Sequence, residues 1–135
     1  MKDIRPALRA FLLADPAIAA AVGDRVYPLK MPQGVDAPSI VYQRISGQGD
    51  YHMQGASGLN RPRIQVGAWA QSIDTAAANA LLVKNRLSGY QGNMGSGAIL
   101  VYVQAVFFDS ERDFFDEQAN LAGTVGDYIF NYDET

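Results

Sequence analysis

The sequence contains no cysteine and a single histidine, His52. The lack of cysteine excludes disulfides, thiolate nucleophiles and Cys-ligated zinc or iron–sulfur sites, and it is compatible with a reducing compartment. His52 lies in a glycine-rich segment with Asp50 and Ser57 nearby. A flexible loop is a poor support for a hydrolytic triad. We therefore expect His52 to be exposed or to lie at an interface rather than to be catalytic.

Long hydrophobic runs are also missing, because Asp15 and Pro16 interrupt the apolar residues near the start of the chain. No continuous stretch reaches the roughly 20 apolar residues that a membrane span needs, and none resembles an export signal.

A basic stripe is absent as well: residues 1–70 carry eight Lys or Arg against five Asp or Glu, and residues 71–135 carry three against nine. This disfavours nucleic-acid binding. The two differently charged halves either have no function or form patches that meet between subunits.

The 135 residues are 48% hydrophobic and 19% charged, a composition typical of a chain that folds around one core. We therefore expect a single domain over residues 1–135.

Three helices are predicted from capping residues and helical spacing. Asp3 is expected to cap the first helix, with Pro6 in its first turn, and Asp15 is expected to cap the second, which ends at Gly23. A third helix is predicted over residues 72–87, with Leu82 pointing away from its buried stripe. That stripe consists of Ile73, Ala76, Ala80, Val83 and Leu87, whereas Asn79, Asn85 and Arg86 are expected to lie elsewhere.

Strands are predicted where apolar and polar residues alternate, and glycine-rich or proline-rich stretches are predicted as loops. In residues 98–108 we expect Val101, Val103 and Phe107 on one face and Val106 and Phe108 on the other. The fold class is therefore α+β: a mostly antiparallel sheet of about four to five strands, packed against two or three helices on one side. The predicted strands are residues 24–28, 39–46, 60–71, 98–108 and 123–132, and the predicted loops are residues 30–38, 47–58 and 88–97.

Three segments contain residues of the types that catalysis or ligand binding uses. The acidic residues 109–117 could supply paired carboxylates or hard-metal ligands, but they lack the spacing of a calcium-binding loop and include Arg112. Residues 92–97 resemble a phosphate-binding loop, but no Lys-Ser/Thr pair or helix follows. Arg61 and Arg63 beside Trp69 are weak support for stacking on single-stranded nucleic acid. We expect no catalytic residue, no cofactor and no metal.

Apolar residues that one small core does not easily bury are candidate subunit contacts: Leu82, the outward side of the strand over residues 98–108, and the pair Phe114 and Phe115. The alternative is that they complete the core. In the glycine-rich segment 47–58, the candidate contact side chains are Tyr51, His52 and Met53.

The chain resembles the tail-completion, or tail-terminator, proteins of long-tailed bacteriophages and gene-transfer agents. The resemblance is carried by residues 8–18 (LRAFLLADPAI), 22–28 (VGDRVYP) and 38–46 (PSIVYQRIS), by the strand-to-helix passage over 63–87 and by the aromatic last strand. It lies in the order and spacing of these segments, and it covers nearly the whole length.

The resemblance implies a virion assembly protein without enzymatic activity, assembled in the bacterial host cytoplasm. Such subunits form a ring, typically a hexamer, on the head-proximal end of the tail tube. The ring ends tube growth and offers a docking surface to the head-side connector. The implied partners are other copies of the chain, the tail tube protein and the connector, with DNA only passing through the lumen. The alternatives are another neck or connector subunit, or a small metal- or carboxylate-dependent enzyme that uses residues 109–117.

Overall fold

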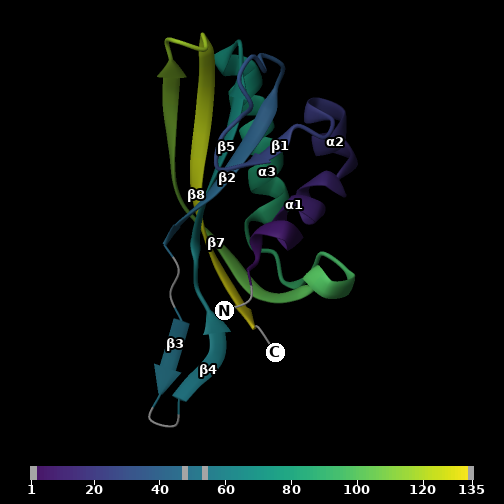
Figure 1. Ribbon diagram of the computed structural model, residues 1–135, viewed down its shortest axis with the longest axis vertical. Coiled ribbons are helices and arrows are strands. Elements are labelled where there is room, and N and C mark those ends of the chain that lie inside the picture. The colour runs from purple at the N-terminus through teal and green to yellow at the C-terminus, as the bar shows by residue number, and fades with distance from the viewer. Residues whose placement is uncertain (1–2, 47–48, 53–54, 134–135) are drawn as a thin grey trace.

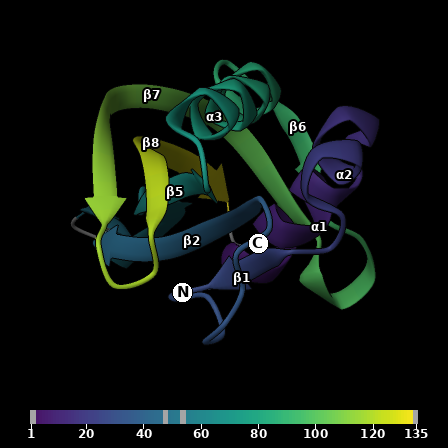
Figure 2. The ribbon, with the colours of Figure 1, turned by 90° about the horizontal axis from the view of Figure 1, so that it is seen from above.

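The computed structural model describes residues 3–46, 49–52 and 55–133. They form one curled, mixed β-sheet with three helices on one side (Figures 1 and 2). The helices are α1 (Arg5–Leu13), α2 (Pro16–Val22) and α3 (Ile73–Leu87), and one turn of 3₁₀ helix, η1, covers Gly97–Ile99. The eight strands are β1 (Val26–Pro28), β2 (Ser39–Ser46), β3 (Gly49–His52), β4 (Gly55–Asn60), β5 (Arg63–Ala70), β6 (Gly92–Met94), β7 (Val101–Asp116) and β8 (Leu121–Asp133). The predicted α+β class is confirmed, although there are more strands than the four to five expected.

β8 is the centre of the sheet. It pairs with β5 and the end of β4 along one edge and with β7 along the other. β2 pairs with the far side of β5, and the short β1 then adds to β2 in the parallel direction. The margins of the sheet are therefore formed by the N-terminal strands on one side and by β7 and β6 on the other.

The glycine-rich segment 47–58 is not the irregular connection that the sequence predicted. β3 and β4 pair with each other as an antiparallel hairpin, which projects from the rest of the sheet in Figure 1. Their neighbours β2 and β5 are already paired, so each further rung extends an existing ladder at little entropic cost. Glycine disfavours a strand by only about 1 kcal/mol or less per residue, and the extended ladder outweighs this penalty.

β7 also differs from its prediction in two ways. It continues through the acidic segment to Asp116, and its pairing with β8 shifts register twice, between Val103 and Ala105 and between Phe108 and Ser110. A β-bulge inserts one extra residue and so turns every later side chain to the opposite face. Consequently Val103 and Val106 are both buried, whereas Phe107 is 54% exposed. The predicted division of this strand into two faces was therefore wrong.

The predicted loop 88–97 is likewise partly regular, because β6 pairs with the start of β7. Met94 of β6 is fully buried in the core. Gly95 has a φ of +79°, and a Cβ at this position would lie 3.0 Å from Cβ of Ala7 in α1. Glycine is needed here both for its backbone conformation and for the close approach of α1.

Local capping explains the helix boundaries. The Asp15 carboxylate accepts a hydrogen bond of 2.9 Å from the Ala17 backbone N–H at the start of α2, as predicted. Asp3 was expected to occupy the N-cap of α1, but Ile4 does so. Asp3 still accepts a 3.0 Å bond from the Arg5 backbone N–H and binds the Arg5 guanidinium. That side-chain bond holds the pKa of the Asp3 carboxyl below its usual value.

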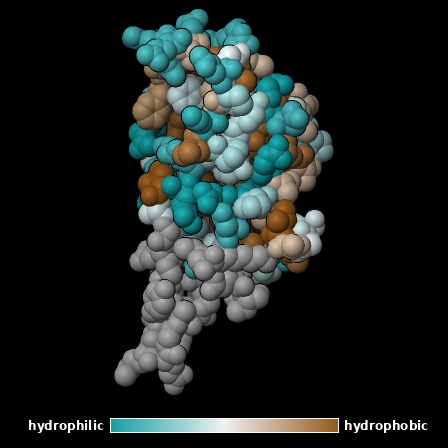
Figure 3. Space-filling view, in the orientation of Figure 1, coloured by the Kyte–Doolittle hydropathy of each residue, from teal (hydrophilic) through white to brown (hydrophobic). Residues whose placement is uncertain are grey.

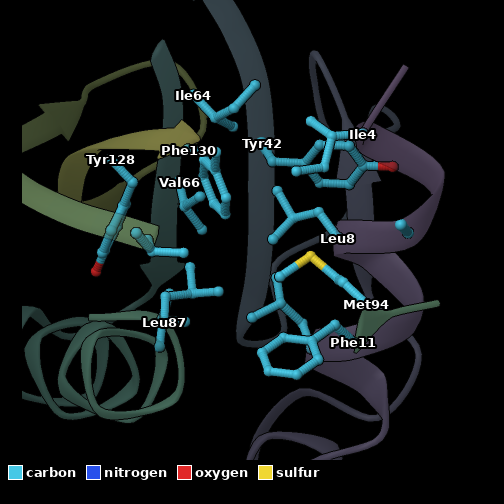
Figure 4. Packing of buried hydrophobic residues seen from close by; sticks show 14 of the residues in the cluster. Ile4, Leu8, Phe11, Tyr42, Ile64, Val66, Leu87, Met94, Tyr128 and Phe130 are labelled. Atoms are coloured by element: carbon cyan, nitrogen blue, oxygen red, sulfur yellow. The ribbon is translucent and has the colours of Figure 1, made fainter. Parts of the chain in front are cut away.

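The core lies between the helices and one face of the sheet. Figure 4 shows Tyr42 pointing toward Ile4, with Leu8 of α1 below them. Phe11 of α1 lies beside Met94, and Val66 and Phe130 lie to the left of Tyr42. Asn79 of α3 was expected to lie off the buried stripe, but it is buried because both α2 and the sheet cover this helix. None of the described helices is long and apolar enough to cross a membrane.

Candidate assembly surface

A long exposed part of the sheet is the β7–β8 arm, which we define as residues 109–120. Every residue from 111 to 120 is exposed. The arm forms because β7 keeps pairing with β8 up to the pair Asp116–Leu121. At its tip, the Asp116 carboxylate accepts hydrogen bonds of 3.0 and 3.2 Å from the backbone N–H groups of Gln118 and Ala119, and Asn120 adopts a φ of +55°. The acidic segment is thus a structured edge strand with a fixed turn.

Phe114 and Phe115 lie on this arm. They are neighbours in a strand, so their side chains point to opposite faces, and they are 45% and 59% exposed. Phe114 stands opposite Gly123 and Phe115 opposite Ala122. Neither belongs to the core, so the alternative that they complete it is excluded. An exposed aromatic pair on an edge strand is typical of a surface that another protein covers.

Beside Phe114, the sheet face that carries no helix forms an open hollow of about 460 Å³. Trp69 lies at the base of the hollow, where Gly123 opposite it and Gly67 beside it leave room for the indole. A Cβ at Gly123 would come within 2.6 Å of two indole carbons. Val125 and Gln65 also line the hollow. The apolar surface of the arm therefore continues onto the body of the sheet. Composition alone could not have revealed this, since Trp69 and Phe114 are 45 positions apart.

The same face carries an ion-pair network that joins β5, β7 and β8. Arg63 lies 2.7 Å from an oxygen of Asp109 and 3.5 Å from Asp127, and Arg112 lies 3.8 Å from Asp127. The hydrogen bond that Arg63 donates to the Asp109 carboxylate is the main reason that the pKa of Arg63 is raised. Arg63 therefore forms ion pairs with carboxylates of its own chain, and this argues against the interpretation that it stacks on nucleic-acid bases.

The structure separates the carboxylates of the acidic segment. In β7 its carboxylates are spread along an extended strand, and Asp113 accepts a 2.9 Å bond from the Thr124 hydroxyl. Within the described ranges, no three His, Cys, Asp or Glu side chains are grouped so as to hold a metal ion.

The remaining candidate contacts lie elsewhere. Leu82 is half-buried and packs partly against the core, while its neighbour Leu81 is 54% exposed. Tyr51 and His52 lie in β3, and Met53 lies outside the described residues. Among the candidate contacts whose side chains the structure describes, Phe114 shares the face of Trp69, because both lie opposite Gly123, and Phe115 borders the same hollow from the next position of the strand.

Comparison with known proteins identifies the class. The chain matches the family model of tail completion protein gp17 over residues 6–130, and it therefore belongs to this family. Its fold is similar to that of a chain in the virion of a native gene transfer agent particle. The TM-score is 0.71 at 19% identity, covering 96% of this chain and 93% of that one. No curated protein sequence matches the chain.

Family membership confirms the resemblance read from the sequence and gives the chain a structural role in a phage-type tail.

Proposed function

We propose that this chain forms a ring, of six copies in the typical case, on the head-proximal end of the tail tube. The ring stops tube growth and offers the surface to which the head-side connector docks. Its partners are other copies of itself, the tail tube protein and the connector, and assembly takes place in the host cytoplasm. DNA passes through the lumen without specific binding, and the chain catalyses no reaction. Family membership is the starting point for this proposal.

The observation that carries it is the β7–β8 arm. Ten consecutive exposed residues that include two exposed phenylalanines form a surface that is unusual for a protein that stays monomeric. The arm is nevertheless rigidly defined by its pairing with the central strand β8. A preordered apolar surface costs little conformational entropy on binding, and this suits repeated contacts in an assembly.

The β3–β4 hairpin is the second surface that we assign to assembly, with Tyr51, His52 and Met53 as its contact residues, and Leu82 is assigned to a contact along α3. Among the described residues, β4 pairs with the body of the sheet at two positions, Leu59 and Asn60, which lie opposite the end of β8. Deleting residues 49–55 is therefore expected to leave the core intact and to abolish assembly. Normal particle yield from this deletion would count against the hairpin as a contact.

The test of the function is electron microscopy of lysates from a producing strain with and without the gene. Filled heads beside unattached, over-long or irregular tails in the deletion strain are expected. Normal joined particles would reject the proposal. Defective heads with normal tails would instead point to a neck or connector subunit.

The arm is tested by restoring the gene with Phe114→Ser and Phe115→Ser together. We expect folded protein and the same tail defect as in the deletion. The control is Leu100→Ser, because Leu100 is 40% exposed and lies just before β7, at the opposite end from the arm. If both variants restore joined particles equally well, the arm is not a contact surface.

A further inference from the structure

The two margins of the sheet carry opposite charge. In the β7–β8 arm, residues 109–117 hold five carboxylates and one arginine, Arg112. All of residues 111–120 are exposed, and the tip of the arm is hydrophilic at the top left of Figure 3. Glu111 and Glu117 are among these exposed carboxylates. The arm therefore presents a negative surface next to its two exposed phenylalanines.

The opposite margin carries arginines, which we call the arginine side: Arg9, Arg25 and Arg44. Nε of Arg9 donates to the Val26 carbonyl at 3.0 Å, and Nε of Arg25 donates to the Pro38 carbonyl at 2.8 Å. A carbonyl acceptor orients a guanidinium but does not neutralise its charge.

Arg44 is exposed on β2, beyond the stretch that β1 covers. The nearby carboxylate of Asp3 is already bound by Arg5. The exposed Asp24 adjoins Arg25 and offsets one of the three charges, so Arg9, Arg25 and Arg44 leave the arginine side with a net positive charge.

The topology places these two surfaces at opposite ends of the strand order. From β1 and β2 the sheet runs through β5 and β8 to β7. Past Val103, no described strand pairs with the outer edge of β7. An edge strand with unpaired backbone groups and exposed aromatic residues invites pairing unless its side chains control which partner approaches.

We propose that the β7–β8 arm of one copy binds the arginine side of a second copy, head to tail. Two arms cannot face each other without bringing their carboxylates together, so a two-fold symmetric arm-to-arm contact is disfavoured. A head-to-tail contact instead satisfies both surfaces and leaves one arm and one arginine side free at the ends. Such a contact propagates until it closes into a ring. This inference rests on the proposed ring and names the surfaces that build it.

The lack of native cysteine allows a direct test by site-specific crosslinking. Two purified chains, Glu111→Cys and Arg44→Cys, are treated with a flexible bismaleimide, separately and mixed, and the same variants are crosslinked in particles from a complemented producing strain. We expect a crosslinked dimer in the mixture and little in either chain alone. A chain that carries both substitutions should give a ladder of larger species. A strong dimer from Glu111→Cys alone, or no crosslink in the mixture and in particles, would overturn the proposal.

Neutralising the arm supplies an independent measurement that does not depend on crosslinker geometry. Glu111→Gln with Glu117→Gln should weaken self-association roughly tenfold, because the attraction across the contact is lost. Raising the salt concentration should weaken the wild-type contact in the same direction. Asp74→Asn, which removes one exposed carboxylate from the start of α3, is the control and should change little. Unchanged self-association of the arm variant would refute the charge argument.

Failure of this inference is distinguishable from failure of the proposed function. If the gene deletion gives unattached tails while the arm variants assemble normally, the tail-end function holds and another surface joins the copies. If the deletion leaves normal particles, the function is rejected whatever the crosslinks show.

Discussion

Replacing Gly123 by alanine should destabilise the protein, and the reason lies in Trp69. The two residues face each other across β5 and β8 on the side of the sheet that no helix covers. A Cβ at Gly123 would lie 2.6 Å from Cδ2 and Cε3 of the indole and 2.8 Å from Cε2. Atoms in folded proteins do not approach this closely, so the ring must move off the sheet.

The expected size follows from two opposing effects. Glycine-to-alanine in a strand interior normally stabilises by about 0.5–1 kcal/mol, because glycine loses more backbone entropy on folding. Overpacking costs about 1–3 kcal/mol. Since the contacts involve a rigid ring rather than the end of a flexible chain, we expect the overpacking to prevail. The net loss in free energy of unfolding should be about 1–2 kcal/mol.

The assay is urea unfolding followed by far-ultraviolet circular dichroism, at a concentration where the chain is monomeric. Gly123→Ala is measured alone, with Trp69→Ala, and with the distant core change Leu12→Ala as a control for additivity. Without the indole, Gly123→Ala should be neutral or slightly stabilising, giving a coupling of about 1.5–3 kcal/mol with Trp69. Its effect should simply add to that of Leu12→Ala. A cycle with Trp69 that is additive within about 0.5 kcal/mol would refute the reasoning.

Three further predictions concern stability and use the same unfolding assay. Phe130→Ala should lower the free energy of unfolding by about 3–5 kcal/mol, because Phe130 is fully buried. Phe115→Ala on the exposed arm should change it by no more than about 0.5 kcal/mol. A similar loss for both would contradict the assigned core. Asp15→Ala should cost about 0.5–2 kcal/mol by removing the N-cap of α2, and an unchanged midpoint would mean that the cap contributes nothing. The pKa of Asp3 is lowered by its bond to Arg5, so Asp3 stabilises the fold above its unfolded pKa, and this contribution is lost as the pH falls through its folded pKa. Asp3→Asn should therefore be less stable than the wild type near neutral pH and equal to it in strong acid; a difference that persists in acid would exclude the ion pair as its cause.

Several elements follow from local sequence alone. α2 is fixed by Asp15, Pro16 and Gly23, because a cap, a preset φ and a left-handed stop act within a few residues. The alternation of apolar and polar residues likewise predicted the strand β5, in which Ile64 and Val66 are buried. The alternation in a strand depends on which residues face the core, and apolar side chains mark those positions in the sequence.

The errors share a different cause. The β-bulge after Val103, the strand character of the acidic segment and the β3–β4 hairpin all depend on what lies beside the chain rather than on the chain itself. A glycine-rich or acidic stretch has no strong preference for a strand, and it becomes one when a paired neighbour extends its ladder. The sequence could not supply that neighbour.

The candidate surface divides in the same way. Sequence alone determined that Phe114 and Phe115 lie in an acidic segment, that the two halves of the chain differ in charge, and which family the chain resembles. Only the tertiary structure decided that the phenylalanines are exposed on an arm, that Trp69 continues their surface, and that acidic and arginine-bearing segments lie at opposite margins of one sheet. Charge and polarity belong to residues, whereas exposure and relative position follow from strand order and packing.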